Sequence, residues 1–167
     1  MADYENRIEW RLETPVVYDE AMKERIVEEQ TGEFPCVFWK KQKNIVVENP
    51  EFCRGERMNA YGIAGSSSVL FPGANVLAAG ETGKCLLSAD VAHKLFGSTN
   101  VSGRSVRIGE RIYQVAGVEF QVKNLCVYEL DPEAGEIVRF GGCWYSEEKD
   151  KYMAKQRAVM TVLNETG

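Results

Sequence analysis

The sequence predicts an α+β fold, with a mixed, mostly antiparallel sheet and about three helices. Two observations support this prediction. Apolar residues recur at helical spacing in about three stretches, and roughly six or seven short apolar stretches between them are bounded by turn residues. With 167 residues the chain is long enough for one domain with its own core. We therefore expect residues 1–167 to form a single domain.

The first helix is predicted over Tyr18–Gln30. Met22 and Ile26 are four residues apart and share one face. Asp19 is placed to cap the first turn, and Thr31-Gly32 ends the helix.

A series of short strands should follow this helix. The expected strands are Phe34–Lys40, Ile45–Glu48 and Arg57–Ala64. The polar pair Lys43-Asn44 separates the first two. Residues 65–83 are rich in Gly, Ser and Ala and are expected to be irregular, with one helical turn around Ser68–Phe71.

The densest set of structural signals lies between Gly83 and Val118. Lys84–Leu87 is a short apolar strand, and Ser88 is placed to accept a free backbone N–H at the start of a helix. Gly97 suits the left-handed conformation that ends a helix. The helix between them has one apolar stripe, formed by Val91, Ala92, Leu95 and Phe96.

A β-hairpin is expected directly after this helix. Its strands are Arg104–Ile108 and Arg111–Val118, and Gly109-Glu110 forms the turn between them. Gly103 is assigned to a turn, and Gly117 to a close approach of two backbones.

The last third of the chain predicts two strands and a helix. The strands are Asn124–Leu130 and Glu136–Tyr145, and Gly141-Gly142 is expected to form a bulge in the second. Ser146 should cap the final helix. The apolar face of that helix is expected to contain Tyr152, Gln156, Val159, Met160 and Leu163.

Composition limits the partners that the chain can have. Its net charge of −5 disfavours nucleic acid and anionic membranes. No stretch approaches the roughly 18 apolar residues that span a bilayer. The acidic start, MADYENRIEWRLE, is not a signal peptide. We expect the chain as given to be soluble.

No catalytic or cofactor-binding motif is present. The segment Gly80–Lys84 would form a phosphate-binding loop only if position 78 were glycine instead of alanine and position 85 were serine or threonine instead of cysteine. A nucleophilic Cys85 would need His93 nearby, but His93 is expected on the helix side opposite the apolar stripe. The carboxylates of Glu147, Glu148 and Asp150 are explained as charges in a first helical turn. We expect neither catalysis nor a cofactor.

The five cysteines are at positions 36, 53, 85, 126 and 143. None has C-x-x-C spacing and the chain has one histidine, so metal binding is not expected. Cys36, Cys85 and Cys126 lie in apolar stretches and are expected to be buried as small hydrophobic residues. One disulfide is compatible with the sequence, which does not select its partners.

Residues 44–120 resemble the extracytoplasmic core domain of MacB/FtsX-type ABC transporter permeases. The resemblance rests on the order and spacing of Cys85–Ser88, Leu95–Ser98, Val101–Gly103 and Tyr113–Val118. The segments Glu48–Glu51 and Leu70–Gly73 are similar to permeases of this type from Gram-positive bacteria. The matching residues have scaffolding roles in the family, which here fall on Ser88, Leu95, Phe96, Gly97, Gly103 and Gly117.

The resemblance implies a domain inserted between the first two transmembrane helices of a permease. Its partners would be those helices and a cytoplasmic ABC ATPase. ATP hydrolysis would be coupled to movement of the domain outside the membrane, where it would engage a peptide, lipid or protein. The alternative is a freestanding secreted module that binds peptide or cell-wall material through Trp39, Trp144 and Tyr145. Assignment of these three aromatic residues to the core is the stronger interpretation.

Overall fold

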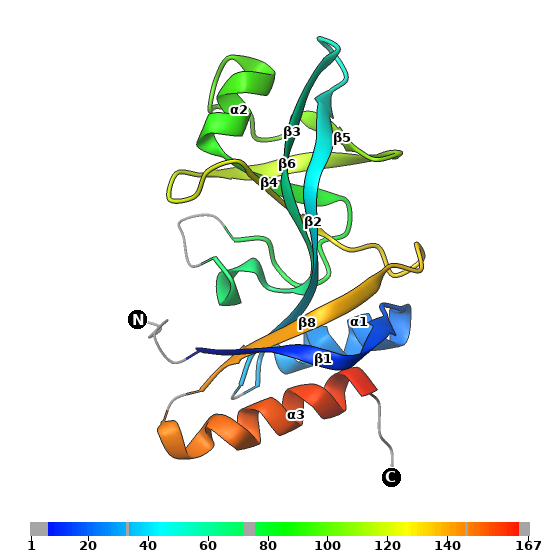
Figure 1. Ribbon diagram of the computed structural model, residues 1–167, viewed down its shortest axis with the longest axis vertical. Coiled ribbons are helices and arrows are strands. Elements are labelled where there is room, and N and C mark those ends of the chain that lie inside the picture. The colour runs from blue at the N-terminus through cyan, green and yellow to red at the C-terminus, as the bar shows by residue number, and fades with distance from the viewer. Residues whose placement is uncertain (1–6, 33, 72–75, 146, 164–167) are drawn as a thin grey trace.

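The computed structural model describes residues 7–32, 34–71, 76–145 and 147–163 (Figure 1). Within these ranges the chain forms eight strands, three α-helices and two short 3-10 helices, so the α+β prediction is confirmed. The strands are β1 (Arg7–Val17), β2 (Cys36–Asn49), β3 (Arg54–Gly65), β4 (Lys84–Ser88), β5 (Ser105–Ile108), β6 (Arg111–Glu119), β7 (Leu125–Glu129) and β8 (Ile137–Trp144). The helices are α1 (Glu20–Glu29), η1 (Ser67–Val69), α2 (Ala89–Phe96), η2 (Glu148–Asp150) and α3 (Lys151–Leu163).

All eight strands belong to one mixed sheet. Their order is β1-β8-β2-β3-β7-β4-β6-β5, and β5 also pairs with β2, which closes six of the strands into a ring. The pairs β3·β7 and β4·β6 are parallel, and the others are antiparallel. The prediction of a mostly antiparallel sheet is therefore correct.

The long β2–β3 hairpin connects two lobes (Figure 1). We call β1, β8, α1, α3 and the first half of β2 the lower lobe, and β4–β7, α2 and the second half of β2 the upper lobe. One edge of β2 pairs with β8 at Cys36–Trp39 and with β5 at Val47 and Glu48. The same strand is thus shared by both lobes.

Two predictions for this region need correction. The predicted break at Lys43-Asn44 is a bulge inside one continuous β2: the register shifts between Gln42 and Ile45, and Asn44 has a φ of 57°. The sequence prediction also omitted β1. Ile8, Trp10 and Leu12 alternate with exposed charged residues, which is the pattern of a strand with one buried face.

Gly141 and Gly142 do not form a bulge. They pair in regular register with β1 on one side and β2 on the other. A Cβ atom at Gly141 would lie 2.9 Å from ring atoms of both Phe38 and Trp10. These glycines are needed because aromatic rings from the neighbouring strands cross directly over them.

The predicted apolar face of α3 is also wrong. Ala154, Ala158 and Thr161 are the buried residues, whereas Tyr152 is 79% exposed and Met160 is 51% exposed. Small side chains let α3 lie close to the sheet and α1. The predicted cap Ser146 and the side chain of Leu163 lie outside what the structure describes.

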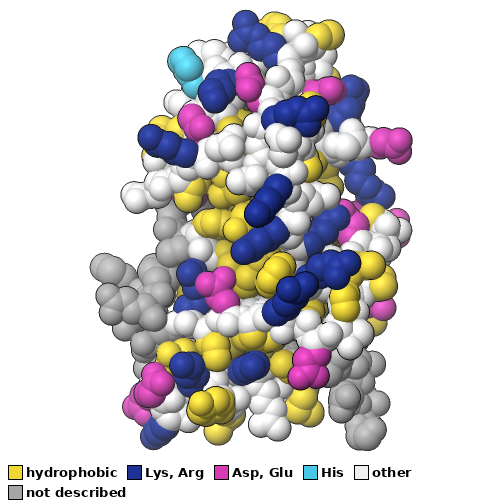
Figure 2. Space-filling model, viewed as in Figure 1, with side chains coloured by type: hydrophobic (Ala, Val, Ile, Leu, Met, Phe, Trp, Pro, Cys, Tyr) yellow, Lys and Arg dark blue, Asp and Glu magenta, His cyan; other side chains and the backbone are white. Residues whose placement is uncertain are grey.

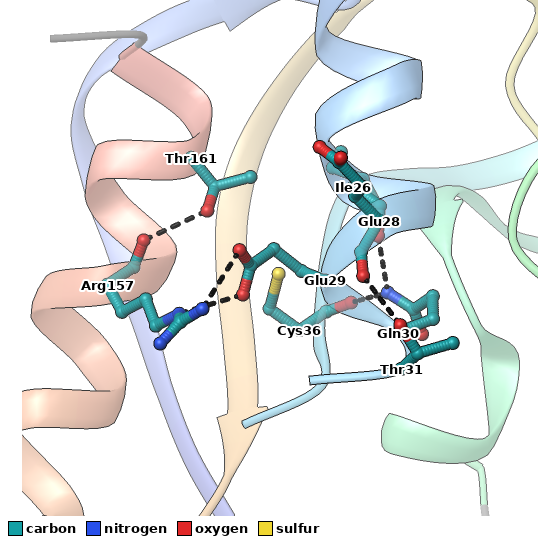
Figure 3. Close-up of polar contacts among 8 residues, drawn as sticks. All are labelled: Ile26, Glu28, Glu29, Gln30, Thr31, Cys36, Arg157 and Thr161. Atoms are coloured by element: carbon teal, nitrogen blue, oxygen red, sulfur yellow. Dashed lines mark hydrogen bonds and ion pairs between the residues drawn. The ribbon is translucent and has the colours of Figure 1, made fainter. Parts of the chain in front are cut away.

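Polar contacts join α3 to α1 (Figure 3). Figure 3 shows Glu29 of α1 paired with Arg157 of α3, and their side chains are 2.9 Å apart. Arg25 of α1 also donates to the carbonyl oxygen of Thr161 at 2.7 Å. At the end of α1, the Gln30 side chain donates to the carbonyl oxygen of Cys36 at 2.9 Å. These contacts fix both helices relative to the start of β2.

Among the described residues, no helix has the length and apolar character needed to cross a bilayer.

Candidate functional site

Ser88 stands at the start of α2 in a capping conformation, but its hydroxyl does not cap the helix. Instead, Ser88 Oγ accepts the backbone N–H of Leu125 at 3.0 Å. The carboxylate of Asp90 accepts the neighbouring N–H of Asn124 at 3.0 Å. Partial burial would raise the pKa of Asp90, but hydrogen bonds to its carboxylate from the Ser88 side chain and from backbone N–H groups hold that pKa below its ordinary value. The first turn of α2 therefore fixes the beginning of β7.

The end of α2 is anchored by Leu95 and Gly97. Gly97 has a φ of 74°, and its N–H donates to the carbonyl oxygen of His93 at 2.8 Å. Leu95 is fully buried, and its carbonyl oxygen accepts the side-chain amide of buried Asn49 at 2.8 Å. Phe96 is half-buried, and the Arg104 guanidinium lies 5.2 Å from its ring centroid. Leu95 is thus the buried anchor, and Phe96 lies at its edge.

The hairpin after α2 begins and turns at glycines. Gly103 has a φ of 86°, and its N–H donates to the carbonyl oxygen of Val115 at 2.8 Å. Gly109 has a φ of 65°, as the first position of a tight turn requires. Gly117 pairs with Leu86 directly after a register shift in β6, and its assignment to close backbone approach stays a prediction.

Of the three aromatic residues considered as a binding surface, only Trp39 is fully covered by the core, and a binding role for Trp144 and Tyr145 stays a prediction. Trp39 is only 1% exposed and stacks on Phe140, with ring centroids 5.9 Å apart. Trp144 is half-buried against the same cluster. The hydroxyl of half-buried Tyr145 donates to Glu148 at 3.3 Å. Trp39 cannot contact a partner in this structure because the core covers it.

A cationic and aromatic surface lies above Trp39 instead. The Lys41 ammonium is 5.1 Å from the ring centroid of Phe140 and 5.6 Å from that of Tyr61. Tyr61 makes an edge contact with Phe71 at 5.1 Å. Figure 2 shows that the visible face gathers Lys and Arg side chains around hydrophobic ones, although the whole chain is acidic. Such surfaces suit acidic or aromatic groups.

A polar groove of about 500 Å³ lies where β2 passes from β8 to β5. Tyr113 and Tyr128 form part of its wall, with ring centroids 5.1 Å apart, and the Tyr128 hydroxyl donates to Gln42 at 2.9 Å. Burial raises the pKa of both phenols, so they remain neutral. The groove therefore offers neutral hydroxyl groups at the junction of the two lobes.

The charged residues that line this groove, apart from Glu110, are paired. Glu136 pairs with Lys40 at 2.8 Å, Glu48 pairs with Arg107 at 3.4 Å, and Arg111 pairs with Asp131. The groove is consequently polar without a strong field of either sign. Among the described residues, no three metal-ligating side chains gather there or elsewhere.

Cys85 and His93 do not form a nucleophile and base pair in this structure. Cys85 is fully buried in β4 and its thiol hydrogen-bonds with Cys126, which together with burial raises its pKa well above the ordinary value. His93 is exposed on α2. A protonated thiol that the core covers is unreactive.

Glu129 is a buried acid that sequence reasoning missed. Its Oε1 accepts the N–H of Gly80 at 3.1 Å, and within the described part of the chain Oε2 has no hydrogen-bond partner. Burial raises the pKa of Glu129 well above its ordinary value, although the amides of Gly80 and Gly65 oppose the shift. Glu129 lies at the end of an apolar strand, where a carboxylate can be either buried or exposed. Its neighbours in the sequence therefore gave no signal that it is buried.

Neither a protein-family profile nor a curated protein matches the chain. Solved structures do. The periplasmic region of MacB from Actinobacillus actinomycetemcomitans is 13% identical, with a TM-score of 0.57, over 81% of this chain and 69% of that one. The extracellular domain of the noncanonic ABC-type transporter YknZ from Gram-positive bacteria is 14% identical, with a TM-score of 0.63, over 95% of this chain and 94% of that one. The fold of this chain is therefore the fold of extracytoplasmic domains from MacB- and YknZ-type ABC transporters.

Proposed function

We propose that this chain is the extracytoplasmic domain of an ABC-type permease, and that it transmits movement driven by a cytoplasmic ATPase to a substrate or partner outside the membrane. The observation that carries the proposal is the shared fold, which extends over 95% of the chain and 94% of the YknZ domain. In this proposal residues 1–167 are one domain of a larger membrane protein.

The arrangement of the lobes supports a mechanical role. Both ends of the described chain belong to the lower lobe, because β1 pairs with β8 and α3 follows β8 (Figure 1). Attachment of both ends to membrane helices would therefore act on this lobe first. The shared strand β2 and its partner β3 would carry the displacement to the upper lobe.

The groove and the Lys41 surface are the proposed places of engagement. The groove lies where β2 changes partners, so relative movement of the lobes would alter its shape. Neutral phenols and paired charges suit a polar peptide or headgroup better than a highly charged ligand. No residue of the proposal takes part in a chemical reaction.

Purification of the full-length gene product from its own cells tests the coupling. We expect it in the membrane fraction, together with an ATPase subunit whose hydrolysis rate changes when residues 7–163 are deleted. Substitution of exposed Ile112 by Thr provides a control that leaves the domain in place. Recovery of the chain from the medium without an ATPase would contradict the proposal and support a freestanding binding module.

A further inference from the structure

The five cysteines divide into two buried pairs and one exposed residue. Cys36 is the register partner of Cys143 across β2 and β8. Cys85 and Cys126 lie on neighbouring strands β4 and β7, and their thiols hydrogen-bond. Cys53 is exposed in the turn between β2 and β3. The two pairs differ in geometry, and this difference determines which of them can form a covalent bond.

Cys36 and Cys143 face each other at the closest position of an antiparallel ladder. The N–H of Trp144 donates to the carbonyl oxygen of Pro35 at 3.3 Å, so Pro35 and Trp144 occupy a hydrogen-bonded position. The next pair along the ladder, Cys36–Cys143, is then a non-hydrogen-bonded pair, for which Cα atoms are typically about 4.5 Å apart. That separation lies within the usual disulfide range of about 4.4–6.8 Å.

The surroundings of this pair also suit a bridge. Both side chains belong to the same core cluster, and each is buried. Figure 3 shows the Cys36 side chain beside Glu29, in the region where α1 and α3 meet. A bridge here would join the start of β2 to the end of β8, next to the helices of the lower lobe.

Cys85 and Cys126 are offset instead. The ladder pairs Cys85 with Tyr128 and Leu87 with Cys126, so the two cysteines are diagonal neighbours on one face. Diagonal positions in a sheet are typically about 7–8 Å apart, with the Cβ atoms somewhat closer. A disulfide needs Cβ atoms about 3.5–4.5 Å apart. The thiols can share a hydrogen bond at this offset, but a covalent bond would require the strands to shift.

We propose that Cys36 and Cys143 form a disulfide in the mature protein, whereas Cys85, Cys126 and Cys53 remain thiols. This inference goes beyond the proposed function. The bridge forms by exchange with a small-molecule disulfide: one cysteine thiolate attacks it and releases one thiolate. The second cysteine then attacks the mixed disulfide and releases the other, so two electrons pass to the small molecule and two protons to solvent.

This thiol–disulfide exchange takes place while the chain folds and not after the fold has formed. Burial raises the pKa of both Cys36 and Cys143 to about 12, so almost no thiolate exists in the folded protein at neutral pH. In the unfolded chain a cysteine has an ordinary pKa near 8.5 and reacts readily. Chain that folds in an oxidising compartment should therefore carry the bridge, and chain folded under reduction should acquire it slowly.

Refolding of the purified chain in a buffer of reduced and oxidised glutathione tests the proposal. Before alkylation, we expect a mass about 2 Da below that of the fully reduced protein. After denaturation and alkylation without reductant, we expect three modified cysteines, 53, 85 and 126. Peptide mapping should recover Cys36 joined to Cys143. Alkylation of all five cysteines, or a major bridge involving Cys53, Cys85 or Cys126, would overturn the proposal.

Thermal unfolding provides a second measurement with matched variants. The bridge closes a loop of roughly 100 residues, so reduction should lower the Tm by roughly 10–15 °C. The C36A/C143A variant should lose this response to reductant, and the C85A variant should retain it. If wild-type Tm is unchanged by reductant, the bridge is absent; such a result would leave the proposed function untouched, because that function does not depend on it.

Discussion

The upper and lower lobes are stabilised in different ways. In the upper lobe, α2 is fixed by apolar burial of Leu95 and by hydrogen bonds from Asn49 and to the start of β7. In the lower lobe, the side chains of α3 that the structure describes as buried are the small ones of Ala154, Ala158 and Thr161, and Arg157 and Arg25 connect α3 to α1. The helix of the upper lobe is thus held by apolar burial and buried hydrogen bonds, whereas the two helices of the lower lobe are joined partly by exposed electrostatic contacts.

Truncation of the upper-lobe anchor should have the largest effect. We expect Leu95→Ala to lower the free energy of unfolding by about 2–5 kcal/mol, because it leaves a cavity beneath α2. Urea denaturation measures the change, and Leu95→Met, which conserves volume, should cost less than about 1.5 kcal/mol. Equal effects of the two substitutions would show that Leu95 is not tightly packed.

Gly141→Ala tests the close packing of strands in the lower lobe. The added Cβ would lie 2.9 Å from atoms of Phe38 and Trp10, so overpacking should cost about 1–3 kcal/mol in the same urea experiment. Alanine at exposed Arg139, also on β8, is the control and should change stability by less than about 0.5 kcal/mol. A Gly141→Ala variant with the same free energy of unfolding as wild type would contradict the close contact of Gly141 with the rings of Phe38 and Trp10.

Buried Glu129 predicts a dependence of stability on pH. The folded pKa is raised above the ordinary value of 4.5, so its contribution is fully present below that value and is lost as pH rises towards the folded pKa. Glu129→Gln should flatten this decline and make the variant more stable than wild type at alkaline pH. Unfolding curves from pH 4 upwards measure the effect, and a Gln variant with an unchanged slope would exclude Glu129 as its source.

The exposed contact between α1 and α3 should have the smallest effect. We expect Arg157→Ala to cost less than about 1 kcal/mol, because solvent screens its ion pair with Glu29. The difference from wild type should shrink further in high salt, as thermal unfolding at two salt concentrations can show. A larger, salt-independent loss would mean that this contact supports the lower lobe by packing.

Sequence reasoning succeeded where neighbouring residues determine the structure. Asp19 caps α1 as expected, since its side chain accepts the N–H of Met22 at 2.8 Å. The positive φ values of Gly97 and Gly109 likewise follow from turns encoded within a few residues. These local signals identified most elements of the upper lobe and the resemblance of its fold.

Long-range contacts explain what could not be predicted. The hydroxyl of Ser88 bonds to Leu125 instead of its own helix, and the burial of Glu129 depends on a distant loop. The aromatic residue Trp39 is an ordinary strand residue in sequence, and its coverage depends on Phe140 from β8. The groove could not be foreseen at all, because it arises where one strand exchanges two distant partners. Only β1 had a missed local signal, the alternation around Trp10.

The placement of this chain outside the membrane is tested most directly by surface labelling of Cys53. This residue is exposed, whereas the other four cysteines are buried. In intact cells that express the full-length gene, a membrane-impermeant maleimide should label Cys53, as peptide mapping can show, and Cys53→Ser should remove the label from this domain. Labelling that appears only after the cells are lysed would contradict an extracytoplasmic domain.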